Sequence, residues 1–269
     1  MKSFIERART GKLRFAAERA LGQHIQKSAW YVSARTAASN YLKRRADVLS
    51  FSQAGEDRII SFIFDALAIE KPTYLDIGAH DPIFISNTYY FYRHGSRGVC
   101  VEPDPLLAKE FRRHRPNDVC LQVGVGVDAE SAADFFLMSS KSLNTFSRET
   151  AEQLERQGAY RIEAVVKIPL VGVNEIISHN FQGAPDVISI DTEGLDLPIL
   201  RTLDFSANRP KVICVETLSP LENGDFEKNL PLMAFIEQQG YFSFGDTFVN
   251  TIYVDRESWL HRPTLRRSD

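Results

Sequence analysis

The sequence predicts an α/β fold in which helices cover both faces of a mostly parallel sheet. From residue 71 onward, short runs of apolar residues alternate with stretches whose apolar residues recur at helical spacing. Strands that are apolar along their whole length are typical of parallel sheets, because both faces of such sheets are buried. The chain has 269 residues, of which 43% are hydrophobic and 25% charged. We therefore expect one large globular domain with an appendage, and not a disordered or fibrous protein.

The alternation assigns each expected element a place along the chain. The expected strands are the apolar runs 73–77, 98–102, 119–123, 187–190, 212–215 and 251–254. The expected helices are the amphipathic stretches 106–114, 173–179, 197–203 and 232–239. Residues 132–170 interrupt this rhythm, so we expect an insertion there, near the active face of the sheet.

The charge of the chain is divided unevenly between its first 45 residues and the remainder. Residues 1–45 carry a net charge of +9 and the other residues a net charge of −12. We expect a basic helical arm over residues 1–48, a main domain over 49–260 and a short tail over 261–269. Apolar residues three or four positions apart predict that the arm is helical.

Aromatic residues interleaved with arginine and lysine favour an arm that lies on an anionic membrane surface, where each basic residue contributes about 1 kcal/mol. A helix packed beside the main domain and a cleaved organellar transit peptide are the alternatives. No apolar run reaches the roughly 18 residues that a membrane-spanning helix needs. Because the main domain is acidic, nucleic-acid binding is not expected.

The three cysteines are Cys100, Cys120 and Cys214. They are odd in number, widely separated and without C-x-x-C spacing, so neither a disulfide framework nor a zinc site is expected. This usage favours a reducing compartment and predicts a cytoplasmic location. If the arm binds lipid, the protein lies peripherally on the inner membrane face.

Polar residues, mostly acidic, follow the expected strands at the edge where open α/β sheets bind ligands. The loop after the first expected strand has one glycine, Gly78. A pyrophosphate site needs the three glycines of G-x-G-x-x-G, and Asp81 in this loop would repel that anion. S-adenosylmethionine carries a sulfonium and an ammonium group in place of phosphates, so acidic surroundings suit it. Glu102, at the end of the second strand, is the candidate partner of its ribose hydroxyls.

A series of motifs follows one another in order from about residue 51 to about residue 253. The motifs are S-Q-A-G-E-D (52–57), Y-L-D-I-G-A-H (74–80), S-N-T (86–88), G-V-C-V-E-P (98–103), I-D-T-E-G-L-D (190–196) and V-I-C-V-E-T (212–217). With these motifs the sequence resembles the FkbM family of S-adenosylmethionine-dependent methyltransferases. The resemblance implies a Rossmann-like class I methyltransferase fold and transfer of a methyl group to oxygen, often of a sugar or glycan-linked acceptor. The first loop departs from many methyltransferases, since Ala79 and His80 stand where a second glycine is common.

The resemblance also implies roles for individual residues. It implies cofactor contact for Asp76, Gly78 and Ala79, ribose contact for Glu102, and a place beside the transferred methyl group for the candidate catalytic residues Asp191 and Glu193. Further candidate cofactor-binding residues, taken from their own places in the sequence, are His80, Asn87, Asp104 and Gly126. For His80, a base, an acceptor ligand and a structural hydrogen bond remain open. For Asn87, a hydrogen bond to the cofactor and a place in a helix N-cap remain open. Residues 142–145, in the insertion, are a candidate loop for contact with the acceptor.

An alcohol is a poor nucleophile until its proton can leave, so methyl transfer to a hydroxyl calls for a positioned base. Asp191 is the candidate, because it ends the strand expected beside the switch point, and burial would raise its pKa toward the working range. Glu193 is expected to orient the acceptor or to cap the next helix. Alternatively, Asp191 and Glu216 bind Mg²⁺, which would acidify the acceptor hydroxyl.

Two other functions compete with that of an O-methyltransferase. The first is a nicotinamide-dependent oxidoreductase, which the missing glycines disfavour. The second is a non-catalytic methyltransferase fold that serves as a scaffold at a membrane surface. The presence together of Asp76, Glu102, Asp191 and Glu193 argues against a scaffold.

Overall fold

The computed structural model describes residues 50–192, 194–220 and 226–263. They belong to one unit, which spans Ser50–Asp269. The expected arm over residues 1–48, most of the expected tail and Glu193 lie outside the described residues. In the part of the chain that is described, no helix has both the length and the hydropathy of a membrane span.

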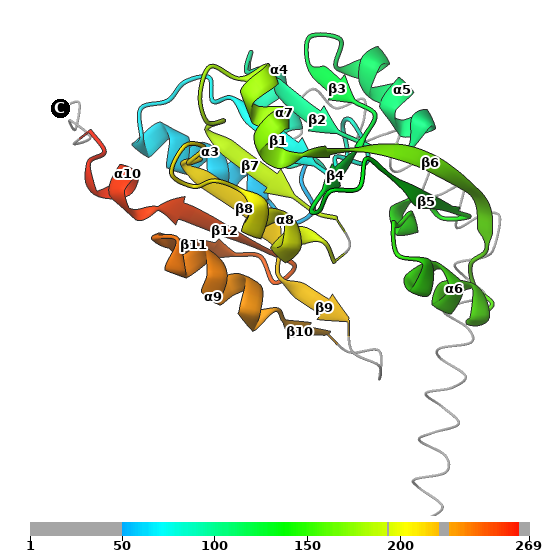
Figure 1. The fold of residues 1–269 in the computed structure, drawn as a ribbon. Coiled ribbons are helices and arrows are strands. Elements are labelled where there is room, and N and C mark those ends of the chain that lie inside the picture. Colours follow the sequence, from blue (N-terminus) through cyan, green and yellow to red (C-terminus); the bar gives the residue numbers. More distant parts are fainter. Residues whose placement is uncertain (1–49, 193, 221–225, 264–269) are drawn as a thin grey trace, which may run out of the picture. The chain divides into compact units, whose positions relative to one another are not determined.

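The centre of the domain is a seven-stranded mixed sheet (Figure 1). Its strands, in chain order, are β1 (Tyr74–Ile77), β2 (Gly98–Val101), β3 (Val119–Leu121), β7 (Val187–Ile190), β8 (Val212–Glu216), β11 (Tyr241–Asp246) and β12 (Asn250–Asp255). Across the sheet they run in the order β11-β12-β8-β7-β1-β2-β3. The pairs that join β3, β2, β1, β7 and β8 are parallel, whereas β12 is antiparallel to both of its neighbours. Counted within this sheet alone, the order is 3-2-1-4-5-7-6, which confirms the Rossmann-like class I methyltransferase fold.

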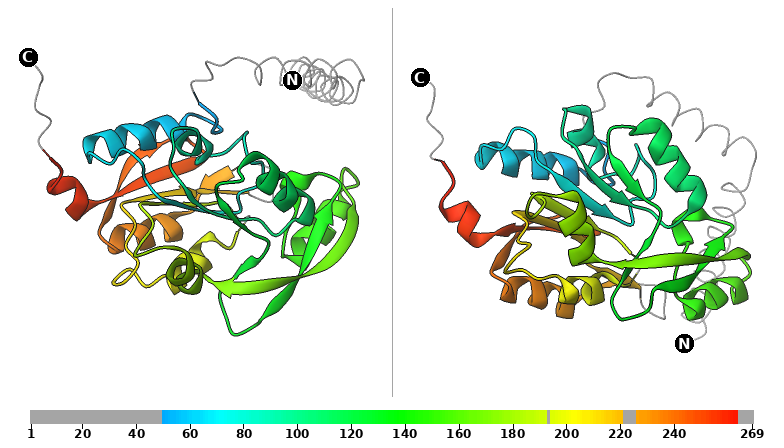
Figure 2. Two further views of the ribbon diagram at one scale, coloured as in Figure 1. Left: turned by 90° about the horizontal axis from the view of Figure 1, so that it is seen from above. Right: turned by 45° about the horizontal axis from the view of Figure 1, so that its top comes forward.

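Helices pack against both faces of the sheet (Figure 2). On one face lie α3 (Glu56–Ala66), α4 (Tyr89–Arg93) and α5 (Pro105–His114), and on the other α7 (Val173–Asn180), α8 (Asp196–Thr202) and α9 (Leu230–Gln238). Successive side chains of a strand point to opposite faces. Leu75 and Ile77 therefore join the core on the α7–α9 side, while Tyr74 joins the core on the α3–α5 side.

Local sequence signals explain where α5 begins and ends. The side chain of Asp104 accepts hydrogen bonds from the backbone N–H groups of Leu106 and Leu107, and Pro105 occupies the first turn. Both features are typical of helix starts. Arg112, Arg113 and His114 fill the last turn, where positive charge is favourable.

Residues 132–170 do interrupt the alternation. They contain β5 (Ala132–Met138), the short helix η1 (Lys141–Leu143), α6 (Arg148–Arg156) and most of β6 (Ile162–Gly172). Strands β5 and β6 pair in antiparallel fashion, and β4 (Gly124–Gly126) joins the other edge of β6. Figure 1 shows this small sheet and α6 beside the central sheet. A further hairpin joins β9 (Leu218–Pro220) to β10 (Phe226–Lys228), and α10 (Arg256–Leu260) follows the last strand.

Candidate active site

A cavity of about 310 Å³ lies at the carboxyl ends of β1, β2, β7 and β8. The chain reverses its direction of travel across the sheet between β1 and β7, and such a switch point is where open α/β sheets bind ligands. The volume is typical of a small-molecule site. The expected site residues that line the cavity are Asp76, Gly78, Ala79, His80, Asn87, Glu102, Asp191 and Glu216.

Gly78 lets the ends of β1 and β7 approach each other. Its φ is +76°, and a Cβ at this position would lie 1.8 Å from the carbonyl oxygen of Asp191. Any side chain would therefore force the two strand ends apart. On the other side, the N–H groups of Gly78 and Ala79 both donate to the carbonyl oxygen of Val101. The first loop is thus fixed against both neighbouring strands.

Glu102 is a buried carboxylate at the end of β2, with 4% of its surface exposed. One of its oxygens accepts a hydrogen bond from the backbone N–H of His80 and the other from that of Asp104, each at 2.8 Å. Burial raises the pKa of Glu102 to about 8, although these two hydrogen bonds act in the opposite direction. Two of about four lone-pair positions are used in this way, so the carboxylate can still accept two further donors. Burial also lowers the pKa of His80, which favours its neutral ring.

Asp76 lies one residue before the end of β1 and is 5% exposed. Its Oδ2 accepts a hydrogen bond of 2.5 Å from the hydroxyl of Thr88. Burial is the largest influence on its pKa and raises it, while the positive charge of Arg115 lowers it. Asp76 is therefore a costly charge to bury, and the residues around it offset part of that cost.

Asn87 lines the cavity from the turn that precedes α4. Its side-chain amide donates to the hydroxyl of Ser189 on β7 at 3.1 Å. The neighbouring Ser86 supplies the helix-start hydrogen bond instead, because its hydroxyl accepts from the backbone N–H of Tyr89 at 3.1 Å. The helix-start role expected for Asn87 therefore belongs to Ser86, and Asn87 itself faces the candidate ligand site.

Asp191 directly follows β7, and Glu216 is the last residue of the neighbouring strand β8. The backbone N–H of Asp191 donates to the carbonyl oxygen of Ile77, which continues the pairing of β7 with β1. Asp191 is exposed and Glu216 is partly buried, and both line the cavity. The burial that was expected to raise the pKa of Asp191 is not present, because the residue is exposed.

The turn after β7 depends on Asp196, a residue for which the motifs predicted no separate role. Asp196, 6% exposed, accepts hydrogen bonds from both the backbone N–H and the hydroxyl of Thr192, each at 3.0 Å. Gly194, in the same turn, has a φ of +107°, and no atom of the described residues lies within 4 Å of an added Cβ. Its backbone angle, and not crowding, therefore favours glycine there. Asp196 and Gly194 hold the segment that presents Asp191.

The insertion contributes one wall of the cavity. The residues of this segment that line it are Phe135, Lys141, Ser142, Asn144, Thr145 and Phe146. The side chain of Asn144 donates to Asp104 Oδ2 at 2.9 Å and accepts from the backbone N–H of Met138 at 2.8 Å. The loop 142–145, expected to contact the acceptor, is thus anchored at the cavity, while its contact with an acceptor stays a prediction.

Two expected cofactor-binding residues do not line the cavity. Asp104 begins α5 and binds Asn144, so its carboxylate is used to hold other parts of the wall. Gly126 is buried within β4, where an added Cβ would lie 3.3 Å from that of Leu170. Gly124, two residues earlier, lines the cavity instead. We therefore correct the roles of Asp104 and Gly126 to positioning and packing.

The segment before α3 brings another residue to the cavity. Asp57 is buried and accepts hydrogen bonds from the backbone N–H of Phe51 and from the hydroxyls of Ser50 and Ser52. These bonds fold the segment so that Gln53 lines the cavity. Within the S-Q-A-G-E-D motif, Gln53 is thus the residue that lines the cavity, and Asp57 holds the segment in place.

Among the described residues, no group of three or more histidine, cysteine, aspartate or glutamate side chains is arranged to hold a metal ion. The Mg²⁺ site expected from Asp191 and Glu216 therefore has no further ligand of these types in that part of the chain. The cysteines are free thiols, and Cys100 and Cys214 are buried in the sheet.

The order of the seven strands is that of the methyltransferase class of α/β proteins. The cavity at its switch point, with carboxylates and one close-packed glycine in its wall, suits that class. Residues 76–243 match the family model described as the methyltransferase FkbM domain. Because the match covers more than half of the chain, the chain belongs to this family, and the protein is a methyltransferase. No curated protein matches the sequence.

Solved structures with a similar arrangement are distant in sequence. A TehB-like SAM-dependent methyltransferase from Corynebacterium glutamicum is 13% identical with a TM-score of 0.41, over 84% of this chain and 99% of that chain. A methyltransferase FkbM from Methylobacillus flagellatus is 14% identical with a TM-score of 0.38, over 69% of this chain and 44% of that chain. An O-methyltransferase from Bacillus cereus, solved in complex with SAH, is 12% identical with a TM-score of 0.38. The match covers 87% of this chain and 95% of that chain. The family assignment rests on the sequence match alone.

Proposed function

We propose that the protein transfers a methyl group from S-adenosylmethionine to a hydroxyl oxygen of a sugar, glycan or glycolipid. The observation that carries the proposal is the set of carboxylates at the switch-point cavity. Asp76, Glu102, Asp191 and Glu216 all line it, from the ends of four neighbouring strands. Such a wall favours a cationic ligand and disfavours a pyrophosphate.

The residues present fit this cofactor. Glu102 has unused acceptor positions beside the two backbone N–H groups that hold it, which suits a pair of ribose hydroxyls. Gly78 lets the ends of β1 and β7 lie close together, so that the first loop and Asp191 border the same cavity. When bound, S-adenosylmethionine supplies a methyl group on a positively charged sulfur.

The rest of the cavity suits a hydroxylated acceptor. Gln53, Ser142, Asn144 and Thr145 offer polar side chains on the side of the insertion and the entry segment. Asp191 is the candidate general base, because it is exposed, lines the cavity and carries a carboxylate that can accept the proton of the acceptor hydroxyl. The protein then acts mainly by holding acceptor oxygen and methyl group in line.

Thermal unfolding with added ligands tests this assignment. S-adenosylmethionine at about 100 times its Kd is expected to stabilise the protein by about 2.7 kcal/mol. NAD at the same concentration is expected to leave the unfolding temperature unchanged, since the cavity offers no pyrophosphate site. Absence of a shift with S-adenosylmethionine, or a shift with NAD alone, would contradict the proposal.

A pair of variants locates the binding site. Glu102→Gln keeps the shape of the side chain but replaces one acceptor oxygen by an NH2 group, which cannot accept from a ribose hydroxyl, so the shift with S-adenosylmethionine should shrink. Glu130→Gln changes an exposed glutamate outside the cavity and should leave the shift as in the wild type. Equal shifts in both variants would place the cofactor elsewhere.

A further inference from the structure

Arg115, in the connection between α5 and β3, is a buried cation that the proposed chemistry does not use. It is 1% exposed. Its Cζ lies 5.2, 5.3 and 5.4 Å from the ring centroids of Tyr74, Tyr92 and Phe111. Arginine is almost never fully buried unless its charge is paired, so its hydrogen-bond partners indicate its role.

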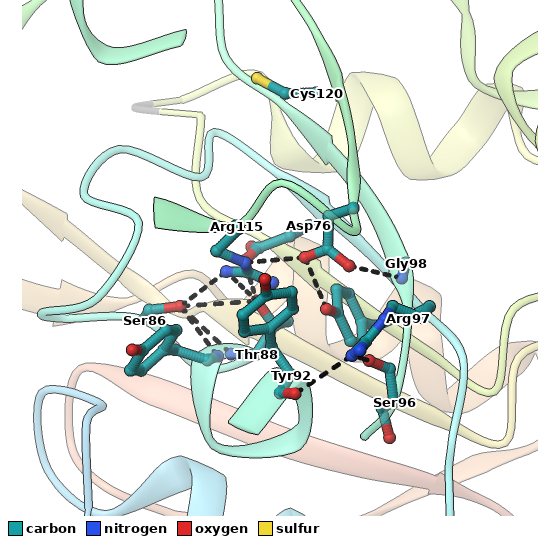
Figure 3. Close-up of polar contacts among 12 residues, drawn as sticks. Asp76, Ser86, Thr88, Tyr92, Ser96, Arg97, Gly98, Arg115 and Cys120 are labelled. Carbon is teal, nitrogen blue, oxygen red and sulfur yellow. Dashed lines mark hydrogen bonds and ion pairs between the residues drawn. The ribbon is translucent and has the colours of Figure 1, made fainter. Parts of the chain in front are cut away.

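The guanidinium group of Arg115 has partners on two sides. Its Nε donates to Asp118 Oδ2 at 2.7 Å, and Asp118 also accepts from the hydroxyl of Tyr74 and the backbone N–H of Gly98. On the other side, both Nη1 and Nη2 donate to the hydroxyl oxygen of Thr88 at 3.1 Å. Figure 3 shows the guanidinium group directed toward Ser86 and Thr88. Asp118 therefore holds Arg115 at its Nε, and the two terminal nitrogens of the guanidinium group contact Thr88.

The hydrogen bond between Thr88 and Asp76 runs from the hydroxyl to the carboxylate. A guanidinium group can only donate, so the Thr88 oxygen accepts from Arg115. A hydroxyl has a single proton, and that of Thr88 is donated to Asp76 Oδ2 at 2.5 Å. The carboxyl group of Asp76 is thereby required to accept, which favours its ionised form.

The charges around Asp76 mostly disfavour its ionised form, and Arg115 opposes them. Burial raises its pKa, and among the groups that face it the guanidinium of Arg115 is the cation that lowers it. The other titratable groups that interact with Asp76 are Asp118, Cys100, Glu102 and Cys214. One cation between the two carboxylates of Asp76 and Asp118 leaves an excess negative charge next to the cavity.

The same arginine holds the turn that carries Asn87. Besides its bonds to Thr88, Arg115 Nη1 lies 3.5 Å from the hydroxyl of Ser86. Ser86 and Thr88 flank Asn87, which lines the cavity. Arg115 thus contacts both sides of a site residue without lining the cavity itself.

We propose that Arg115 is a positioning residue of the cofactor site, which acts through Thr88 to keep Asp76 charged and oriented so that Asp76 attracts the cationic part of the ligand. This inference rests on the proposed use of S-adenosylmethionine. It assigns to Arg115 an effect on the pH dependence of binding that a residue needed only for packing would not have.

The test is the affinity for S-adenosylhomocysteine, which keeps the ammonium group, measured by calorimetry between pH 5 and 8. In the wild type, binding weakens as Asp76 is protonated at low pH. In Arg115→Met, the pH at which binding weakens should rise by about one to three units, because the opposing positive charge is lost. Thr88→Val should also raise this pH, whereas Thr88→Ser keeps the hydroxyl and should behave like the wild type.

Two controls separate this effect from stability and from other titrating groups. Asp118→Asn removes the ion pair with Arg115 and should lower the unfolding temperature, but it also removes a negative charge that faces Asp76. The pH at which binding weakens should therefore not rise. In an Asp76→Asn background, Arg115→Met should no longer shift the profile, which excludes Glu102 as the origin of the shift.

A uniform loss of affinity at every pH in Arg115→Met would show that Arg115 is only structural. Identical profiles for Thr88→Val and Thr88→Ser would also overturn the inference, and this pair decides the question if Arg115→Met does not fold. Failure of the wild type to bind S-adenosylhomocysteine at any pH would instead overturn the proposed function.

Discussion

Replacing Asp191 with asparagine is expected to lower kcat by about 10²–10⁴-fold while the Kd for S-adenosylmethionine stays close to the wild-type value. The amide keeps the size of the side chain but cannot take the proton of the acceptor hydroxyl. Because Asp191 is exposed at the cavity, the substitution leaves the core unchanged. Formation of S-adenosylhomocysteine with a hydroxylated acceptor found by screening measures the rate, and calorimetry measures the affinity.

Glu216→Gln is the matched variant for Asp191→Asn. Glu216 is also a carboxylate at the cavity, on the neighbouring strand β8. If Asp191 is the base, the loss of rate in Glu216→Gln should be the smaller of the two. Full turnover in Asp191→Asn, or a large loss only in Glu216→Gln, would refute the assignment of Asp191.

Gly78→Ala is expected to lower the free energy of unfolding by about 3–5 kcal/mol and to abolish cofactor binding. The added Cβ would lie 1.8 Å from the carbonyl oxygen of Asp191, and the φ of +76° is itself unfavourable for alanine. The clash is with backbone, so no side-chain rearrangement relieves it. Denaturant unfolding measures the loss of stability.

Gly158→Ala separates the two causes. Gly158 follows α6 and has nearly the same φ, +75°, but no atom of the described part of the chain lies within 4 Å of an added Cβ. It should therefore cost only the backbone strain, about 1–2 kcal/mol. Equal losses in the two variants would show that the close approach of β1 and β7 is not what requires glycine at position 78.

Most of the central sheet could be predicted from the sequence, because its parallel strands are continuously apolar. The run 187–190 coincides with β7, and the run 212–215 with all but the last residue of β8. Strand β11 escaped prediction because it lies antiparallel at the sheet edge and mixes aromatic with polar residues. The pairing of β5 with β6 could not be predicted for a similar reason, because half-exposed strands lack a continuous run of apolar residues.

Site residues at the ends of strands could be predicted from the sequence. Residues whose role depends on contacts between distant segments could not. Asp104 is followed by proline, a helix-start signal that its position after a strand obscured. Arg115 closes a run of basic residues that is typical of a solvated helix end, yet it is buried by partners from β1, α4 and its own loop. No local pattern contains those contacts.

The basic arm over residues 1–48 and Glu193 lie outside the described residues, so the expected membrane contact and the expected role of Glu193 stay predictions. The sugar or glycan acceptor is likewise a proposal. What the fold and the family establish is a methyltransferase with its cavity at the switch point of the sheet.

A crystal structure of the protein with S-adenosylhomocysteine is the decisive measurement for the cofactor site. We expect the ligand to occupy the cavity at the ends of β1, β2 and β7, with its ribose hydroxyls within hydrogen-bond distance of Glu102. A ligand bound at another surface, or a ribose without contact to Glu102, would contradict this placement.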